Sequence, residues 1–218
     1  MNILSEILGW SYFTVWSFSF YPQLYLNYKL KTCKAVSKAL LSFNIIGFYS
    51  YSLYTLLPND LVSLSDKVFA IHALTLSVII FIQCYYYDKI SKVYIPVLVS
   101  IVVILSWIDK DYLGPIKVVI TLIKYLPQVY LNFKNSSTIG FSTTGILMDL
   151  SGGILSILQL FWDAAIRKTD FNEIFSKNAT KLLLSSASLS MDCVLIFQAI
   201  IYKNSKQEDV EVIKEFVV

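Results

Sequence analysis

Four ionisable side chains lie inside segments that are otherwise apolar enough to cross a membrane: Lys117, Lys124, Asp149 and Asp192. A charge at the centre of a transmembrane helix costs roughly 2.5–3.5 kcal/mol on insertion scales, so such residues usually serve a function. Carboxylates in a hydrated interior can bind and release protons, and a lysine can bind a carboxylate. These residue types therefore indicate a wet pathway with two protonatable acids and at least one fixed cation.

A structural role is the alternative, in which Asp149 and Asp192 form buried salt bridges with Lys117 and Lys124. Buried ion pairs stabilise weakly compared with apolar packing, so we favour the hydrated pathway.

Helical spacing adds polar residues to the faces that carry these charges. The expected stripe of the fifth span contains Lys117, Thr121, Lys124, Gln128 and Asn132. In the first span, Trp16, Gln23 and Asn27 share one face. The sequence thus predicts that polar stripes from several helices line one central pathway.

Asp66 lies near the start of the third span, in "SLSDKVF". Its carboxylate could cap that helix by accepting hydrogen bonds from first-turn amides. It could equally be an acid at the mouth of the pathway, and the sequence leaves both possibilities open.

Composition identifies a membrane protein, because 56% of the residues are hydrophobic and only 15% are charged. Soluble domains are nearer a quarter charged, and a span needs about 20 apolar residues. We expect an all-α fold of seven transmembrane helices, with spans at 7–28, 39–59, 68–87, 93–108, 112–133, 135–162 and 182–202.

The lysines indicate how the chain is oriented. The first loop contains Lys29, Lys31, Lys34 and Lys38 without an acid, and loops that face the cytosol are enriched in lysine and arginine. This pattern puts the amino terminus on the luminal side and the carboxyl terminus in the cytosol. It also accounts for the net charge of +3 without a nucleic-acid surface.

Two stretches, "WSFSFYPQLYLNYKLK" and "TLIKYLPQVYLNFKNS", match at an offset of 105 residues. The match continues into the following helices, where Asn44 aligns with Asp149. We expect two parallel three-helix repeats and a linker helix (3+1+3), as in some secondary transporters. The predicted units are 1–90, a linker at 91–111, 112–203 and a cytosolic tail at 204–218.

Pro22 and Pro127 occupy equivalent positions in these repeats. Each removes a backbone donor and frees the carbonyl four residues earlier, at Phe18 and Ile123. Static kinks are the simpler interpretation, since proline is common in transmembrane helices. Because the defect occurs twice with the same polar neighbours, we favour paired hinges.

The cysteines Cys33, Cys84 and Cys193 lack metal-ligand spacing, and we interpret them as small apolar fillers. We expect no metal site, no cofactor and no enzymatic activity, because the sequence contains no hydrolytic or redox constellation.

Several segments together resemble the cystinosin family of PQ-loop transporters: "WSFSFYPQ", "FNIIGFYSYSLY", "SDKVFAIHAL", "IKYLPQVYLNF", "LMDLSGG" and "LSMDCVLIF". The resemblance extends from Gly9 to Tyr202. It implies export of cystine together with protons from a lysosome or vacuole to the cytosol by alternating access, with protons as the coupling ion.

The resemblance also implies roles for particular residues. Asp149, Asp192 and Asp66 correspond to proton-coupling acids, and Asp149 also to a substrate ligand. The remaining expected substrate-binding residues are Lys124, Lys117, Gln128, Asn132, Asn44, Gln23, Asn27 and Trp16.

One position departs from the family pattern, because Gly145 stands where an asparagine is common. The substrate could therefore differ, and export of a cationic amino acid or another small solute remains an alternative. A seven-helix retrieval receptor that binds cargo without moving it is a further alternative.

Overall fold

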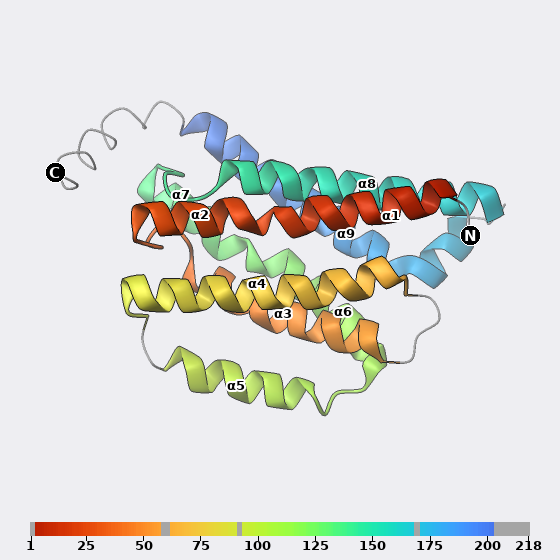
Figure 1. Ribbon diagram of the computed structural model, residues 1–218, viewed down its shortest axis with the longest axis horizontal. Helices are drawn as coiled ribbons and strands as arrows, with labels where there is room; N and C mark the ends of the chain where they lie inside the picture. The colour runs from red at the N-terminus through yellow and green to blue at the C-terminus, as the bar shows by residue number, and fades with distance from the viewer. Residues whose placement is uncertain (1–2, 58–61, 91–92, 168–170, 203–218) are drawn as a thin grey trace.

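The computed structural model describes residues 3–57, 62–90, 93–167 and 171–202, and these ranges form one elongated bundle of helices (Figure 1). Its elements are α1 (Ile3–Phe18), α2 (Phe20–Leu30), α3 (Lys38–Leu56), α4 (Leu64–Asp88), α5 (Tyr94–Leu105), α6 (Lys110–Lys124), α7 (Leu126–Asn135), α8 (Thr143–Arg167) and α9 (Phe171–Ile201). Single residues separate α1 from α2 and α6 from α7, so the helices make seven rods. The all-α prediction is confirmed, whereas the predicted tail at 204–218 lies outside the described residues.

Both breaks come just before a proline of the repeated motif. The first rod breaks at Ser19, three residues before Pro22, and the sixth and seventh helices meet at Tyr125, two residues before Pro127. A helix can begin with proline because its first amides need no intrahelical acceptor. The two prolines therefore interrupt the rods at matching places.

Two predicted span starts were wrong, because a serine side chain caps the helix at a different residue in each case. The sixth span begins at Thr143, not at residue 135, since Ser142 accepts from the Gly145 amide at the start of α8. The third span begins at Leu64, where Ser63 accepts from the Asp66 amide. The last helix, α9, begins at Phe171, and its membrane-spanning part, Lys181–Ile201, agrees with the predicted span at 182–202.

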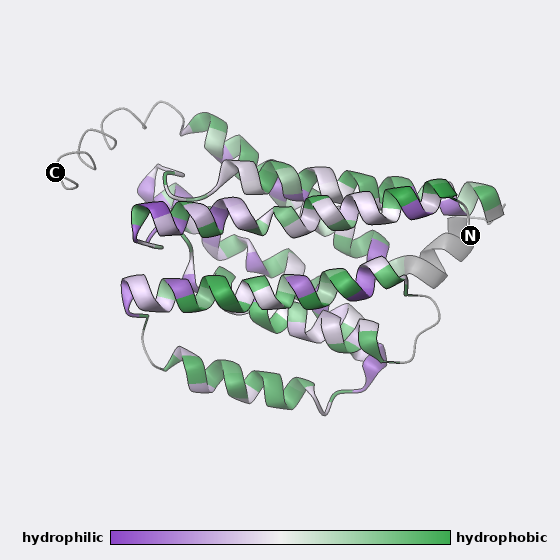
Figure 2. Cartoon of the chain, viewed as in Figure 1, coloured by the Kyte–Doolittle hydropathy of each residue, from purple (hydrophilic) through white to green (hydrophobic). Residues whose placement is uncertain are grey.

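The outer surface is apolar, as a bilayer requires. Within the described part of the chain, three helices are long and apolar enough to cross a membrane individually, at Leu64–Asp88, Thr143–Ile166 and Lys181–Ile201, and Tyr94–Leu105 is a shorter apolar helix. Figure 2 shows α5 as almost uniformly hydrophobic. Exposed side chains such as Val103, Ile82 and Phe197 would be unfavourable in water, so we treat this surface as lipid-facing.

Helix packing follows the sequence repeat. We call α1 to α4 the first half and α6 to α9 the second half. Within the halves, α3 packs on α4 and α8 packs on α9. Between the halves, α1 packs on α8 and α6 packs on α3, while α5 contacts α3 at the side of the bundle (Figure 1). The two halves thus exchange equivalent contacts across a shared interface.

The glutamine beside the first proline joins the two halves. Gln23 donates from Nε2 to Asn27 Oδ1 (2.7 Å) and to the Gly140 carbonyl (3.0 Å). Its Oε1 accepts from the Ser142 amide at 2.8 Å. Gly140 and Ser142 belong to the loop that precedes α8, so this side chain connects α2 to the second half.

The second glutamine makes the equivalent bonds from the second half to the first half. Gln128 donates to Asn132 Oδ1 (2.9 Å) and to the Ala35 carbonyl (2.8 Å), and it accepts from the Ser37 amide at 2.8 Å. Ala35 and Ser37 lie in the loop that precedes α3. We call these two reciprocal arrangements the PQ latches.

Each latch is anchored by a further glutamine. Asn27 donates to Gln83 Oε1 in α4, and Asn132 donates to Gln198 Oε1 in α9, both at 3.0 Å. The repeat inferred from the sequence is therefore reproduced bond by bond at these positions.

A disulfide corrects the interpretation of the cysteines. Cys33 and Cys84 are bonded to each other, and both are buried, while Cys193 is free and exposed. Two of the three predicted fillers thus form a crosslink between the first loop and α4. The sequence did not predict this disulfide, because its two cysteines are 51 residues apart.

The PQ latches predict matched losses of stability. Gln23→Glu or Gln128→Glu replaces an amide donor with an acceptor and leaves a half-buried carbonyl and an asparagine oxygen unpaired, at a cost of about 2–4 kcal/mol. We expect the Tm of the purified protein to fall by roughly 5–15 °C in both variants.

Asn135→Asp is the matched control, because Asn135 is exposed at the end of α7. It should leave the Tm nearly unchanged. A stable Gln128→Glu protein would show that the latch does not hold the halves together.

Candidate functional site

Two cavities meet in the middle of the bundle. The larger has a volume of about 110 Å³ and the smaller about 50 Å³. Lys124 and Asp149 line both of them, together with Phe48 and Phe69. A lysine and an aspartate are therefore placed where the two spaces come together.

The cavities extend toward opposite ends of the bundle. The larger reaches Val36 and Phe141, in the loops that precede α3 and α8, at the end that also carries the lysines of the first loop. We call this the lysine-rich end. The smaller reaches Asp66 and Lys181, toward the end where α1 begins, which we call the amino-terminal end.

The two central acids share one serine. Asp149 accepts at Oδ2 from the Tyr125 hydroxyl (2.8 Å) and from Ser188 Oγ (3.3 Å). The same Oγ lies 3.4 Å from Oδ2 of Asp192, which is 1% exposed. Asp192 Oδ1 has no hydrogen-bond donor within the described part of the chain. A proton or an ammonium group could therefore be bound here.

The central lysines are held by groups other than carboxylates. Lys124 donates to Asn44 Oδ1 at 3.2 Å and lies 4.4 Å from the centre of the Tyr125 ring. Lys117 lies 3.7 Å from the centre of the Phe48 ring. The face of an aromatic ring attracts a cation, so both lysines are held in place without a bonded carboxylate.

The buried salt bridges that the sequence left open are not found. Among the described residues, the ion pairs are Lys38–Asp88 (2.8 Å) and Lys181–Asp66 (3.7 Å), and neither lies at the centre. The proposed structural role for the four central charges therefore finds no support, and the hydrated pathway stays a prediction.

Asp66 belongs to a cluster at the amino-terminal end. Its Oδ1 accepts from the Tyr12 hydroxyl (2.7 Å), and its Oδ2 accepts from Ser63 Oγ (2.7 Å) and faces Lys181. The cap of α4 is Ser63, so the capping role considered for Asp66 is wrong. The carboxylate instead connects α4 with α1 and α9.

A lysine from α9 completes this cluster. Lys181 donates to Gln159 Oε1 (2.7 Å) and to the Tyr12 hydroxyl (3.2 Å). Gln159 also donates to the Ser5 carbonyl at the start of α1. We call this set of Tyr12, Asp66, Gln159 and Lys181 the clasp, because it joins four helices beside the smaller cavity.

The structure brings together only part of the predicted site. Lys124, Asp149, Asp192 and Asn44 line the larger cavity, and Lys117 lines the smaller one. The remaining polar residues serve the latches: Gln128, Asn132 and Asn27 are buried with their amides bonded to protein groups, and Gln23 also borders the larger cavity.

Trp16 borders the smaller cavity and holds α8 in place. Its Nε1 donates to the Asp149 carbonyl at 2.9 Å. The ring lies against Gly152, where an added Cβ would come within 2.4 Å of Trp16 Cδ1. A glycine is needed at this point of closest approach.

Gly145 has a structural explanation as well. A Cβ at this position would lie 2.7 Å from the Ser19 carbonyl oxygen, which is a backbone atom at the first helix break. The glycine therefore allows α8 to approach the break, and an asparagine here would require the backbone to move.

Sequence reasoning missed four residues of the site, namely Tyr125, Lys181, Tyr12 and Gln159. Tyr125 lies two residues before the second Pro-Gln pair, so proximity to that motif was the available signal. Helical spacing does predict that Ser188 lies on the same side of its helix as Asp192, one turn away. Lys181 was assigned to a loop, although it lies inside α9. No local pattern links it to Tyr12, which is 169 residues away.

Known proteins are similar in sequence to this chain. The PQ loop repeat family matches residues 4–64 and 111–166, which is more than half of the chain. A cystinosin homolog of Dictyostelium discoideum is 39% identical over 95% of this chain and 84% of its own length. Cystinosin of Drosophila melanogaster is 33% identical, covering 93% of this chain but 59% of the fly protein.

A cystine transporter of Saccharomyces cerevisiae is 26% identical over 94% of this chain and 96% of its own length. The two matched repeats each contain one Pro-Gln pair and one PQ latch glutamine. The chain belongs to the cystinosin family of PQ-loop membrane proteins.

Proposed function

We propose that this protein carries cystine together with protons out of an acidic organelle, a lysosome or vacuole, into the cytosol. The observation that supports this most directly is the pair of cavities, one toward each end, that meet at Lys124 and Asp149. A carrier needs a central site that can be reached from either side in turn. Relatives named cystinosin and cystine transporter indicate the substrate.

The site has groups suited to a zwitterionic disulfide. Cystine has two ammonium and two carboxylate groups. Lys124 with Asn44 is proposed to bind a carboxylate, and Asp149 to bind an ammonium group. Asp192, next to Ser188, is proposed as the second proton station. A proton can drive transport only if its binding energy differs between the two facing states.

The proposed motion is an exchange between two parallel three-helix units, 1–90 and 112–203, with 91–111 as the linker. Matching helix contacts and matching latches support this arrangement. Bending at Pro22 and Pro127 would swing α2 and α7 at the lysine-rich end. By the positive-inside rule that end is cytosolic, so the clasp would close the luminal end.

Transport itself is the decisive experiment. We expect purified protein in proteoliposomes to accumulate labelled cystine when the side that faces the amino-terminal end is acidic, and to accumulate less without the pH gradient. Labelled lysine and glucose are the comparison substrates. Lysine transport would favour a cationic amino-acid exporter, and saturable cystine binding without flux would favour a retrieval receptor.

Proton coupling predicts different effects for the two central acids. Asp192→Asn should abolish the cystine-evoked proton current while leaving cystine binding within about threefold of wild type. Asp149→Asn should abolish both, because it also removes the proposed ammonium ligand. The measurements are current in proteoliposomes on a solid support and binding of labelled cystine.

Ser190→Ala is a control for these variants, since that serine is exposed on α9 and bonds only its own helix backbone. Unchanged proton current in both aspartate variants would remove the proposed mechanism.

The clasp predicts a change in pH dependence. Lys181→Met removes the cation that pairs with the Asp66 carboxylate and joins α9 to α4, so the luminal end should open with less help from the pH gradient. We expect the ratio of cystine transport rates at luminal pH 5 and pH 7 to fall at least threefold. Lys67→Met, at the residue after Asp66, is the control and should retain the wild-type ratio.

A further inference from the structure

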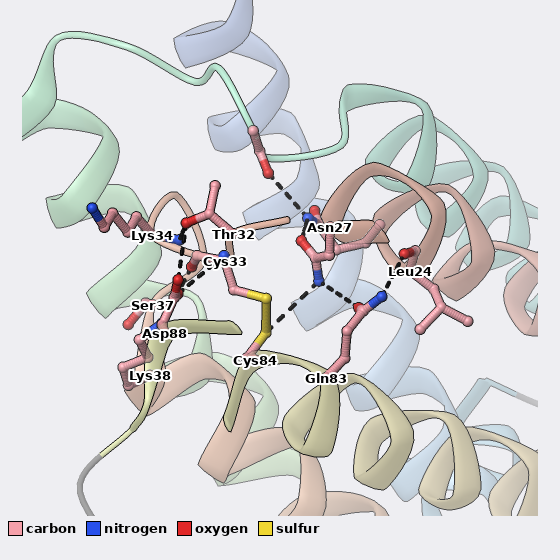
Figure 3. The surroundings of a disulfide bond; sticks show 12 residues. Leu24, Asn27, Thr32, Cys33, Lys34, Ser37, Lys38, Gln83, Cys84 and Asp88 are labelled. Atoms are coloured by element: carbon pink, nitrogen blue, oxygen red, sulfur yellow. Dashed lines mark hydrogen bonds and ion pairs between the residues drawn. A yellow bond between two sulfur atoms is a disulfide. The ribbon is translucent and has the colours of Figure 1, made fainter. Parts of the chain in front are cut away.

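The Cys33–Cys84 disulfide lies where the first half meets the second (Figure 3). Cys33 is in the loop after α2, and Cys84 is in the last part of α4. Two residues further along this loop, the Ala35 carbonyl accepts the latch bond from Gln128. The crosslink therefore fixes the loop on which the second half docks.

Noncovalent contacts already define the resting position of this loop. Asp88, the last residue of α4, accepts from the Cys33 amide (3.0 Å), from Thr32 Oγ1 (2.9 Å) and from Lys38 Nζ (2.8 Å). Asn27 of the first latch lies 3.7 Å from Cys84 Sγ. Such noncovalent contacts can break and re-form during a motion, whereas a covalent bond cannot. The disulfide is therefore the contact that prevents the loop from separating from α4.

The second half has no equivalent crosslink. At the repeat offset, Cys33 corresponds to Thr138, and in the register that pairs Gln83 with Gln198, Cys84 corresponds to Ala199. The latch bonds occur in both halves, so the repeated architecture forms without a disulfide. The disulfide is therefore present in the first half only, at a place where the two halves otherwise match.

We propose that Cys33 and Cys84 are a redox-modification site that controls the first hinge. In the oxidised protein, the end of α2 is tied to α4, so α2 cannot swing about the break at Ser19, and only the second hinge can move. In the reduced protein both hinges move, and transport is faster.

The chemistry is thiol–disulfide exchange. Both sulfurs are buried in this conformation, so a small thiol reaches the bond when the loop contacts open. The first thiol attacks one protein sulfur, which releases the other protein thiol and leaves a mixed disulfide. A second thiol attacks the small-molecule sulfur of that mixed disulfide and releases the remaining protein thiol, and the products are two protein thiols and one small disulfide. The reverse reaction uses a small disulfide as oxidant. It receives two electrons and the two thiol protons and leaves as two small thiols.

Resting on the proposed function, the oxidant can be the transported substrate, because cystine is itself a small disulfide that would be released at this end. Cytosolic thiols would reduce the bond again. The pair would then slow export when cystine arrives faster than the cytosol reduces it.

The test compares oxidised and reduced protein in the same proteoliposomes. Dithiothreitol followed by N-ethylmaleimide and peptide mass measurement reports the state of each cysteine. We expect reduction to raise the initial rate of cystine transport at least threefold, and Cys33→Ser and Cys84→Ser to have this higher rate without any response to dithiothreitol. Cys193→Ser is the control and should respond like wild type.

Amide hydrogen exchange gives a readout that does not require transport. Reduction should increase exchange in the 31–37 loop of the Cys193→Ser protein but leave the matching 136–142 loop unchanged. If neither the wild type nor any variant transports cystine but reduction still increases exchange at 31–37, the proposed function is wrong. The proposal that the disulfide restrains this loop would remain.

Any of three results would overturn the proposed redox control: a disulfide that excess dithiothreitol does not reduce, a reduced protein that transports cystine at the rate of the oxidised protein, or unchanged amide exchange at 31–37.

Discussion

Inside a bilayer, every backbone amide and carbonyl must find a partner within the protein, and this constraint organises the whole molecule. The prolines at 22 and 127 violate it at matching points, and the helices break there. The neighbouring glutamines bind loop backbone of the opposite half. The helix breaks are thus beside the glutamines that join the two halves. The cavities between the halves depend on the breaks and on these glutamines.

The central site is built directly onto one of these breaks. Tyr125 is the single residue between α6 and α7, and its hydroxyl donates to Asp149; Lys124, the last residue of α6, is its neighbour. A change of charge on Asp149 would therefore act on a residue at the helix break without any long relay. Proton coupling, as proposed, requires that the energy of proton binding depend on the position of the helices.

The two halves share a scaffold but differ in chemistry. Asn44 of the first half occupies the repeat position of Asp149, and Phe20 that of Tyr125. The ion pair of Lys38 with Asp88 and the disulfide occur in the first half. A duplicated scaffold can provide equivalent motions at two places, and the differing side chains can give those motions a direction.

The sequence by itself determined the all-α membrane class, the seven rods, the repeat and the identity of the central charges, because composition and helical periodicity are local properties. Only the tertiary structure decided the partners: Asn44 for Lys124, Lys181 for Asp66, loop backbone for the PQ glutamines, and Cys84 for Cys33. It also moved the helix boundaries to the serine caps at Ser63 and Ser142. Periodicity fixes the face of a helix on which a side chain lies, but which residue meets that face depends on how helices distant in sequence pack together.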